Sequence, residues 1–252
     1  RGSQFFCNTR FIFAALALLA RAHAAAATST THCAWYDATG VANFPKGCNN
    51  NALGDVNDAA IAYVSDGYSN CGKTGSANFF ARTTHNGQAS GVADLNGNMW
   101  EVNTGLTSDG TNFYLLKTSA NAAALTGSNT LSTDAWGATG ITANYDSLGA
   151  TYESLQARST VVTYGSATQV FSAATTGTAW TAAGAGVPLA GGTTGSNAFG
   201  NDGLWDYRPN ELCVISGGFW DSGSHAGAWA LALAAVRSAS YGDVGLRAAS
   251  YL

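Results

Sequence analysis

The C-terminal segment from Gly217 to Leu252 has the sequence GGFWDSGSHAGAWALALAAVRSASYGDVGLRAASYL and combines two kinds of position. One kind is a frame of residues suited to tight turns and to packing. The frame consists of Gly217, Gly218, Trp220, Gly227, Trp229, Leu231, Leu233, Val236, Arg237, Val244, Gly245 and Arg247. Between its members lie residues that share no chemistry, and we predict that the following form a ligand-binding surface: Phe219, Asp221, Ser222, Ser224, His225, Ala228, Ala232, Ala234, Ala235, Ala239, Tyr241, Gly242 and Asp243.

The residue types in this mixed set are restricted in a way that points to their origin. The segment contains no Lys, Glu, Gln or Met, and every residue type of the mixed set has a codon that ends in a pyrimidine. Randomising the adenines of the asparagine codon AAC produces this restriction. Randomised positions must tolerate almost any side chain, so we expect them to be exposed and to contribute little to stability. Phe219, His225 and Tyr241 are the expected strong contacts, and Asp221 and Asp243 would add charge selectivity.

The composition of the whole chain excludes several classes of protein. Its 252 residues are enough to bury a sizeable core, and seven Trp with 46% hydrophobic residues exclude a disordered chain. Charged residues make up only 10%, and the net charge is −4. We therefore expect no binding to nucleic acid and no insertion into a membrane.

The N-terminal region contains an apolar stretch, Phe11–Ala20, that is too short to span a membrane. We expect a helix over Phe11–Ala26 that packs on the domain. The alternative is a secretory signal peptide over residues 7–26.

The apolar pattern of the rest of the chain predicts a single domain over residues 1–252. Leu53–Val64 has apolar residues at helical spacing, which predicts a second helix with Asp55 as its cap. Gly91–Val102 is typical of a turn that leads into a strand. Residues 104–200 are rich in Ser, Thr, Gly and Ala, and we interpret them as a loop-rich insertion with strand-like pieces at Phe113–Leu116 and Val161–Tyr164.

In the tail, Trp229, Leu231 and Leu233 alternate with alanines. A period of two predicts a strand whose large residues point inward and whose alanines point outward.

The five cysteines are Cys7, Cys33, Cys48, Cys71 and Cys213, and no two of them form a CxxC pair. Their number and spacing predict neither a zinc site nor a full disulfide framework. Buried free thiols, with at most one bridge, are the expected state.

Three short motifs resemble the signatures of a known family. They are Gly97–Glu101 (GNMWE), Gly217–Trp220 (GGFW) and Val244–Arg247 (VGLR), and they resemble those of the formylglycine-generating-enzyme subgroup of the C-type lectin fold. The tail is more specifically similar to the variable proteins of diversity-generating retroelements. The resemblance is concentrated in the tail, is weaker over Cys33–Trp100, and hardly reaches the middle of the chain.

The resemblance implies a fold and a function. The fold is an α+β, loop-rich C-type lectin fold with short antiparallel strands, to which we add the two N-terminal helices. The function is display of a variable region, residues 217–252, on a virion or a cell surface. This region would bind a protein or cell-surface ligand. A structural or surface protein of the same fold without diversification, such as a phage tail component, is the alternative.

The resemblance also implies a structural calcium ion, with no other cofactor required. Its ligands would be the side chains of Asp94 and Glu101 and the backbone carbonyls of Gly97 and Met99, a donor set that suits a hard cation. Alternatively, the two carboxylates only accept hydrogen bonds from backbone amides in a turn.

An enzymatic function is not expected. The reactive cysteines of the family's oxidase correspond to Ser222 and Gly227 here, and Cys213 lies in an apolar run before the motif. The chain also lacks HExxH, GxSxG and P-loop motifs. A formylglycine-generating oxidase is therefore the least favoured alternative.

Overall fold

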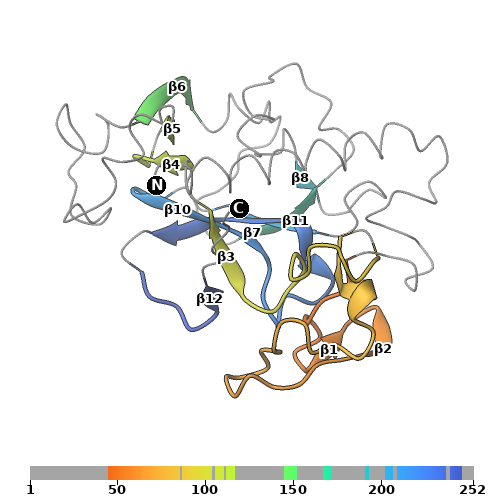
Figure 1. Ribbon diagram of the computed structural model, residues 1–252. Coiled ribbons are helices and arrows are strands. Elements are labelled where there is room, and N and C mark those ends of the chain that lie inside the picture. The colour runs from red at the N-terminus through yellow and green to blue at the C-terminus, as the bar shows by residue number, and fades with distance from the viewer. Residues whose placement is uncertain are drawn as a thin grey trace, which may run out of the picture.

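The computed structural model describes residues 45–85, 87–103, 106–110, 112–116, 145–151, 167–171, 191–192, 202–206, 209–236 and 239–245. A seven-stranded sheet with the order β12-β3-β10-β11-β9-β7-β8 lies at the centre of these residues (Figure 1). Its strands are β3 (Trp100–Asn103), β7 (Ala167–Phe171), β8 (Gly191–Gly192), β9 (Gly203–Asp206), β10 (Leu212–Gly217), β11 (Gly227–Val236) and β12 (Val244–Gly245). The β11–β9 and β12–β3 pairs are parallel and the other pairs are antiparallel, so the sheet is mixed rather than wholly antiparallel.

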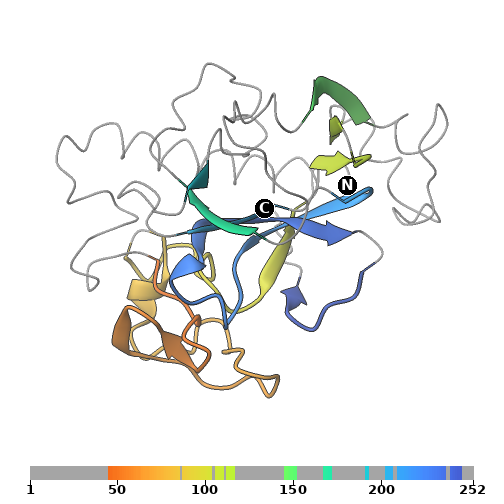
Figure 2. The same ribbon diagram turned by 180° about the vertical axis from the view of Figure 1, so that it is seen from behind.

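A second, antiparallel sheet lies above the central one in Figures 1 and 2. It contains β4 (Leu106–Ser108), β5 (Asn112–Leu116) and β6 (Tyr145–Thr151). The Thr107 hydroxyl of β4 donates to the Leu212 carbonyl of β10 at 2.9 Å, which joins the two sheets. The predicted strand over Phe113–Leu116 is confirmed by β5, whereas Val161–Tyr164 lies outside the described residues.

The predicted helix over Leu53–Val64 is wrong, because this segment forms a β-hairpin. Strand β1 (Gly54–Asp55) pairs with β2 (Asp58–Ala62) through a two-residue turn, with Asp55 opposite Asp58. The Asp55 carboxylate accepts hydrogen bonds from the amides of Gly47 and Asn57 at 2.9 and 2.8 Å. The Asp55 side chain therefore closes the turn through Asn57 instead of capping a helix. Its second partner, Gly47, lies outside the segment.

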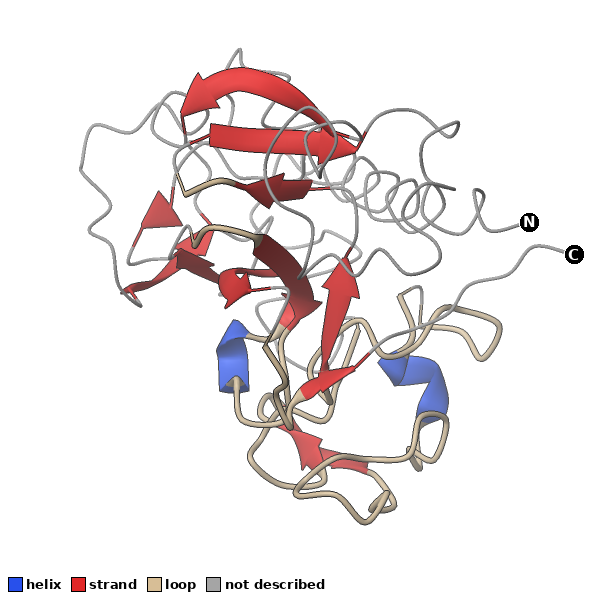
Figure 3. Cartoon of the chain, turned by 90° about the vertical axis from the view of Figure 1, so that its left-hand side faces the viewer, coloured by secondary structure: helices blue, strands red, loops and turns tan. Residues whose placement is uncertain are grey.

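Short 3-10 helices are the only helices in the described part of the chain (Figure 3). They are η1 (Phe80–Thr83) and η4 (Gly223–His225). The predicted N-terminal helix over Phe11–Ala26 lies outside the described residues. The described fold is thus a loop-rich domain dominated by strands, with a mixed sheet at its centre.

Strand β11 confirms the strand predicted in the tail, and its two faces differ. Leu231 and Leu233 are almost fully buried on one face, next to Leu204 of β9, which pairs with Leu231. The prediction that the alanines point into solvent is wrong for Ala230 and Ala232, which are buried on the other face. Aromatic residues from neighbouring strands cover this face, and period-two alternation along one strand does not reveal such a cover.

A β-bulge changes the alternation near the end of β11. Cys213 of β10 pairs with Ala235, but Ile215 pairs with Ala232, so β11 has one extra residue between these pairs. An extra residue reverses which side of the sheet the following side chains occupy. Ala235 consequently joins Ala230 and Ala232 in one buried apolar cluster with Trp100 and Ile215.

Candidate functional site: an aromatic cavity beside the motif junction

The three motifs, far apart in the sequence, meet at one junction. The Gly97 amide donates to the Gly217 carbonyl at 2.8 Å, and the Trp220 amide donates to the Asn98 carbonyl at 3.1 Å. The Trp100 amide donates to the Asp243 carbonyl at 2.8 Å. Strand β12 then continues the junction in parallel pairing, with its two residues opposite the last two residues of the first motif. All these contacts join backbone groups, so they do not depend on the side chains of the residues between the motifs.

The glycines of the second motif are required by the backbone. Gly217 and Gly218 have φ angles of +91° and +80°, a region that favours glycine. A Cβ on Gly218 would also lie 2.7 Å from the Cβ of Ala226. The expectation that the motif glycines are needed for backbone conformation is therefore confirmed for Gly217 and Gly218, whereas Gly245 has no positive φ.

An aromatic cavity of about 230 Å³ lies next to this junction. Six of the predicted ligand-binding residues line it: Phe219, Ala232, Ala234, Ala235, Tyr241 and Asp243. The other lining residues are Trp100, Trp205, Ile215 and Val244. We call this space the aromatic cavity below. Predicted ligand-binding residues and residues of the frame or the sheet thus line the same cavity.

The rings around the aromatic cavity lie in two nearly perpendicular orientations. Trp205 lies edge-on to Trp100, with ring centroids 4.9 Å apart and an interplanar angle of 89°. Phe219 is stacked near Trp100 at 6.3 Å and 27°. The rings therefore present walls in two nearly perpendicular directions. Edge-to-face and offset arrangements of this kind are the favoured geometries for aromatic pairs.

Ring contacts continue beyond the cavity on both sides. Phe219 contacts Trp220 with centroids 5.2 Å apart, and Trp220 contacts Tyr68 at 6.2 Å. On the other side, Trp205 contacts His225 at 6.3 Å. Two predicted ligand-binding residues, Phe219 and His225, are thus held against the aromatic frame.

The predicted ligand-binding residues differ in exposure. Tyr241 is 48% exposed, and Asp221 and Gly242 are also exposed. Several others are half-buried: Phe219, Ser224, His225, Ala228, Ala234, Ala239 and Asp243. The expected exposure is wrong for Ser222, Ala232 and Ala235, which are 8%, 4% and 5% exposed.

The three buried positions have separate physical reasons. The Ser222 hydroxyl accepts a hydrogen bond from the Phe219 amide at 3.1 Å, so this side chain closes the turn before η4. Ala232 and Ala235 form the floor of the aromatic cavity, where rings of the neighbouring segments cover them.

Four residues of the cavity were not among the predicted ligand-binding residues. Trp100 belongs to the first motif, Val244 belongs to the frame, and Ile215 lies in an apolar run. Trp205 comes from β9 and pairs with Ala232 across the sheet. The only signal for Trp205 in the sequence is a large aromatic residue in a segment rich in small and polar residues.

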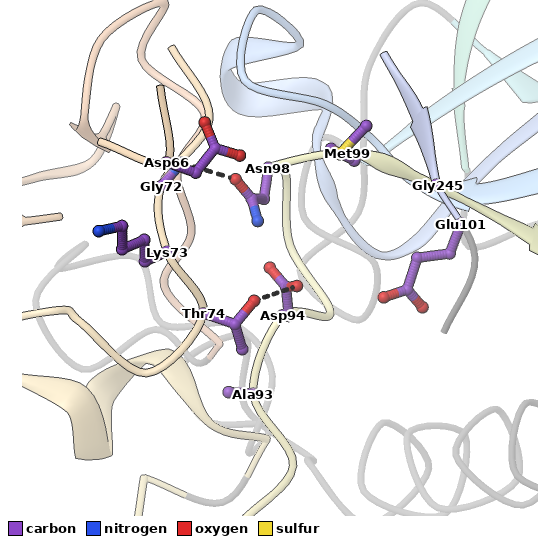
Figure 4. Close-up of a pocket in the computed structure, with 10 residues that line it drawn as sticks. All are labelled: Asp66, Gly72, Lys73, Thr74, Ala93, Asp94, Asn98, Met99, Glu101 and Gly245. Atoms are coloured by element: carbon purple, nitrogen blue, oxygen red, sulfur yellow. Dashed lines mark hydrogen bonds between the residues drawn. The ribbon is translucent and has the colours of Figure 1, made fainter. Parts of the chain in front are cut away.

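The predicted calcium ligands lie around a second cavity of about 660 Å³, shown in Figure 4. Asp94, Met99 and Glu101 line it, but Gly97 does not. The Asp94 carboxylate accepts a hydrogen bond from the Thr74 hydroxyl at 3.0 Å. Within the described residues, no group of three or more His, Cys, Asp or Glu side chains is arranged to hold a metal ion. The calcium site remains a prediction.

The two cavities lie on opposite faces of the edge formed by β3 and β12. Trp100 and Val244 are paired and line the aromatic cavity, whereas Glu101 and Gly245 are paired and line the second cavity. Asp66, Asp94 and Glu101 bring three carboxylates to the second cavity, with Lys73 as the cationic lining residue.

Two of the described thiols, Cys48 and Cys71, are unsuited to nucleophilic chemistry. Cys48, Cys71 and Cys213 form no disulfide, and the first two are buried. Burial raises the pKa of Cys48 to about 11 and the pKa of Cys71 to about 12. Both thiols are therefore protonated at neutral pH, and a thiol attacks or binds metal as its thiolate. Cys7 and Cys33 lie outside the described residues.

Comparison with known proteins adds no relative. No protein-family model matches the chain, and no curated protein matches it. Among the described residues, no helix has the length and apolar character that crossing a membrane requires.

Proposed function

We propose that this chain is a display protein that binds a protein ligand through the aromatic cavity and the tail positions around it. In this proposal the domain has the C-type lectin fold of the formylglycine-generating-enzyme subgroup, and a retroelement diversifies its tail. The observation that carries the proposal is that six of the interchangeable tail residues line one cavity. A pattern in the sequence and a hollow in the structure coincide.

The way the tail is held supports this proposal. Asp243 contributes its backbone carbonyl to the motif junction, and Phe219 contributes its carbonyl to the turn with the Ser222 amide at 3.0 Å. Because backbone groups are common to all residues, side chains at Phe219 and Asp243 can change while these contacts persist. Among the described contacts, Ser222 is an exception, since its side chain makes one of the turn's hydrogen bonds.

The size of the aromatic cavity favours a protein ligand over a free small molecule. Pockets for drug-sized ligands measure roughly 300–1,000 Å³. A cavity of about 230 Å³ suits one protruding side chain, while the surrounding tail contacts the rest of the partner. Aromatic side chains at the centre of an interface provide much of its binding energy.

Two alternatives use the same fold. The burial of Ser222, Ala232 and Ala235 favours a structural or surface protein without diversification, because buried positions tolerate fewer residues. The protonated state of Cys48 and Cys71, with Ser222 and Gly227 at the positions of the family's reactive cysteines, argues against an oxidase.

Selection from a display library tests the binding function. Phe219, Asp221, Ala234, Tyr241 and Asp243 would be randomised together, and the library selected against unrelated protein targets. We expect folded binders whose affinity is lost when a bulky residue fills the aromatic cavity. A matched library that randomises Leu204, Leu212, Leu231 and Leu233 should contain mostly unfolded members, because these side chains are almost fully buried. Binders whose affinity is unchanged when a bulky residue fills the aromatic cavity would contradict the proposal.

The gene itself tests the diversification. We expect a near-copy of the segment that encodes Gly217–Leu252 close to the gene, next to a reverse transcriptase. The copy should carry adenines wherever the two segments differ. A copy without adenine bias would favour the undiversified alternative.

A further inference from the structure

Asp243 is the one charged residue among those that line the aromatic cavity. Asp243 is half-buried and lines the cavity with four aromatic residues, Trp100, Trp205, Phe219 and Tyr241. Its backbone carbonyl accepts the Trp100 amide, but within the described part of the chain its carboxylate forms no hydrogen bond or ion pair. The aromatic cavity thus combines four aromatic residues with one acidic residue whose carboxylate has no hydrogen-bond or ion-pair partner among the described residues.

This combination suits a planar cation. A guanidinium stacks on an aromatic face and at the same time directs its N–H groups, which lie in its plane, toward a carboxylate. The 89° angle between Trp100 and Trp205 gives one wall on which the group can stack and another that its stem can contact. Arginine forms paired hydrogen bonds with one carboxylate. A lysine ammonium is more strongly hydrated and would need further acceptors to replace its water.

We propose that the aromatic cavity binds an arginine side chain of a protein partner. The guanidinium stacks on one of the two nearly perpendicular walls, which are formed by Trp100 with Phe219 and by Trp205, and its stem contacts the other. It donates hydrogen bonds to the Asp243 carboxylate. This inference rests on the proposed function, because it assigns a ligand group to the same cavity.

The surroundings of the cavity favour a cationic protein segment. Tyr241 at the cavity and Tyr68 beside Gly242 are 48% and 50% exposed, so they offer aromatic surface that a partner can cover. The second cavity, on the other face of β12, adds the carboxylates of Asp66, Asp94 and Glu101 against the ammonium of Lys73. An excess of carboxylates near the binding site attracts a cationic partner and repels an anionic one.

Capped single amino acids test this inference on the full chain. N-acetyl-arginine methylamide would be titrated against its citrulline analogue, which has nearly the same shape without the charge, and against the lysine analogue. Binding would be followed by chemical-shift changes in NMR spectra. We expect the arginine compound to bind at least about fivefold more tightly than the citrulline compound, which is about 1 kcal/mol.

Three variants separate the outcomes. Asp243→Asn should reduce arginine affinity to the citrulline level and leave the backbone contact with Trp100 intact. Ala232→Leu should fill the cavity and abolish binding of both compounds. Glu211→Gln removes the same charge outside the cavity, just before β10, and should change neither affinity.

The arginine assignment and the cavity function fail in different ways. Equal affinities for arginine and citrulline, unchanged in Asp243→Asn, would overturn the arginine assignment. The same would follow if lysine bound more tightly than arginine. The proposed binding function would still stand if Ala232→Leu abolished that binding and the selected protein binders also lost affinity. If Ala232→Leu affected neither the compounds nor the selected binders, both proposals would be overturned.

Discussion

Strand β11 contains mainly leucine and alanine, and its two faces pack in different ways. On one face, Leu231 pairs with Leu204 of β9, and Leu204, Leu212, Leu231 and Leu233 are all almost fully buried. On the other face, Ala232 and Ala235 form the floor of a cavity whose walls come from other strands. One strand therefore carries a sealed core on one side and, in the proposed function, the binding cavity on the other.

In the proposed function, this difference explains how the site varies without loss of the fold. A leucine buries several methyl and methylene groups, each worth about 0.8 kcal/mol, whereas an alanine buries one. The alanine face contributes less to stability and leaves space, while its rigid walls come from Trp100 and Trp205. The following predictions rank substitutions on the two faces from the largest effect on stability to the smallest.

Leu233→Ala should have the largest effect. The side chain is fully buried in the leucine face, so its loss leaves a cavity and should lower the free energy of unfolding by about 2–5 kcal/mol. Urea denaturation followed by circular dichroism would measure the change. A loss below about 1 kcal/mol would mean that the leucine face is not the sealed core described above.

Ala230→Leu should have the second largest effect. Ala230 is 0% exposed and does not line the aromatic cavity, so there is no space for the added atoms. Overpacking of this kind costs about 1–3 kcal/mol, again measured by urea denaturation. An unchanged midpoint would show that the alanine face is loosely packed beyond the cavity.

Ala232→Leu is the matched substitution on the same face. Because Ala232 lines the aromatic cavity, the added atoms enter open space, and stability should change by less than about 1 kcal/mol. Ligand binding, measured by calorimetry with a selected protein binder, should nevertheless be lost. If both alanine variants were destabilised equally, the hollow would not provide the expected room.

Tyr241→Ala should have the smallest effect on stability. The side chain is 48% exposed, so the free energy of unfolding should change by less than about 0.5 kcal/mol. The affinity for a binder that covers the cavity should fall by at least about 1 kcal/mol, since exposed tyrosines at an interface are frequent hot spots. A stability loss larger than the affinity loss would assign Tyr241 to the frame.

The sequence predicted the local features of this comparison better than the features that depend on distant partners. The strand predicted in the tail depends on a pattern within one segment, and β11 confirms the strand. The hairpin at Leu53–Val64 was missed because Asp55 bonds to Gly47, outside the segment. Helical spacing of apolar residues gave no information about that contact.

The candidate site was predicted in part for the same reason. Tail positions such as Phe219, Tyr241 and Asp243 stand out by their unrelated chemistry, and they do line one cavity. The burial of Ala235 depends on a bulge that one-strand patterns cannot show, and the wall at Trp205 depends on the parallel pairing of β9 with β11. Sequence patterns along one segment do not contain these long-range pairings.

The close approach of Trp100 and Trp205 gives the cavity an optical property. Two indoles with centroids 4.9 Å apart exchange excitation, so their ultraviolet emission depends on what lies between and beside them. A guest that enters the hollow changes the polarity around both chromophores. The intensity and wavelength of the intrinsic tryptophan fluorescence therefore report whether the aromatic cavity is occupied, without any attached dye. The same holds for every variant of the tail that keeps Trp100 and Trp205.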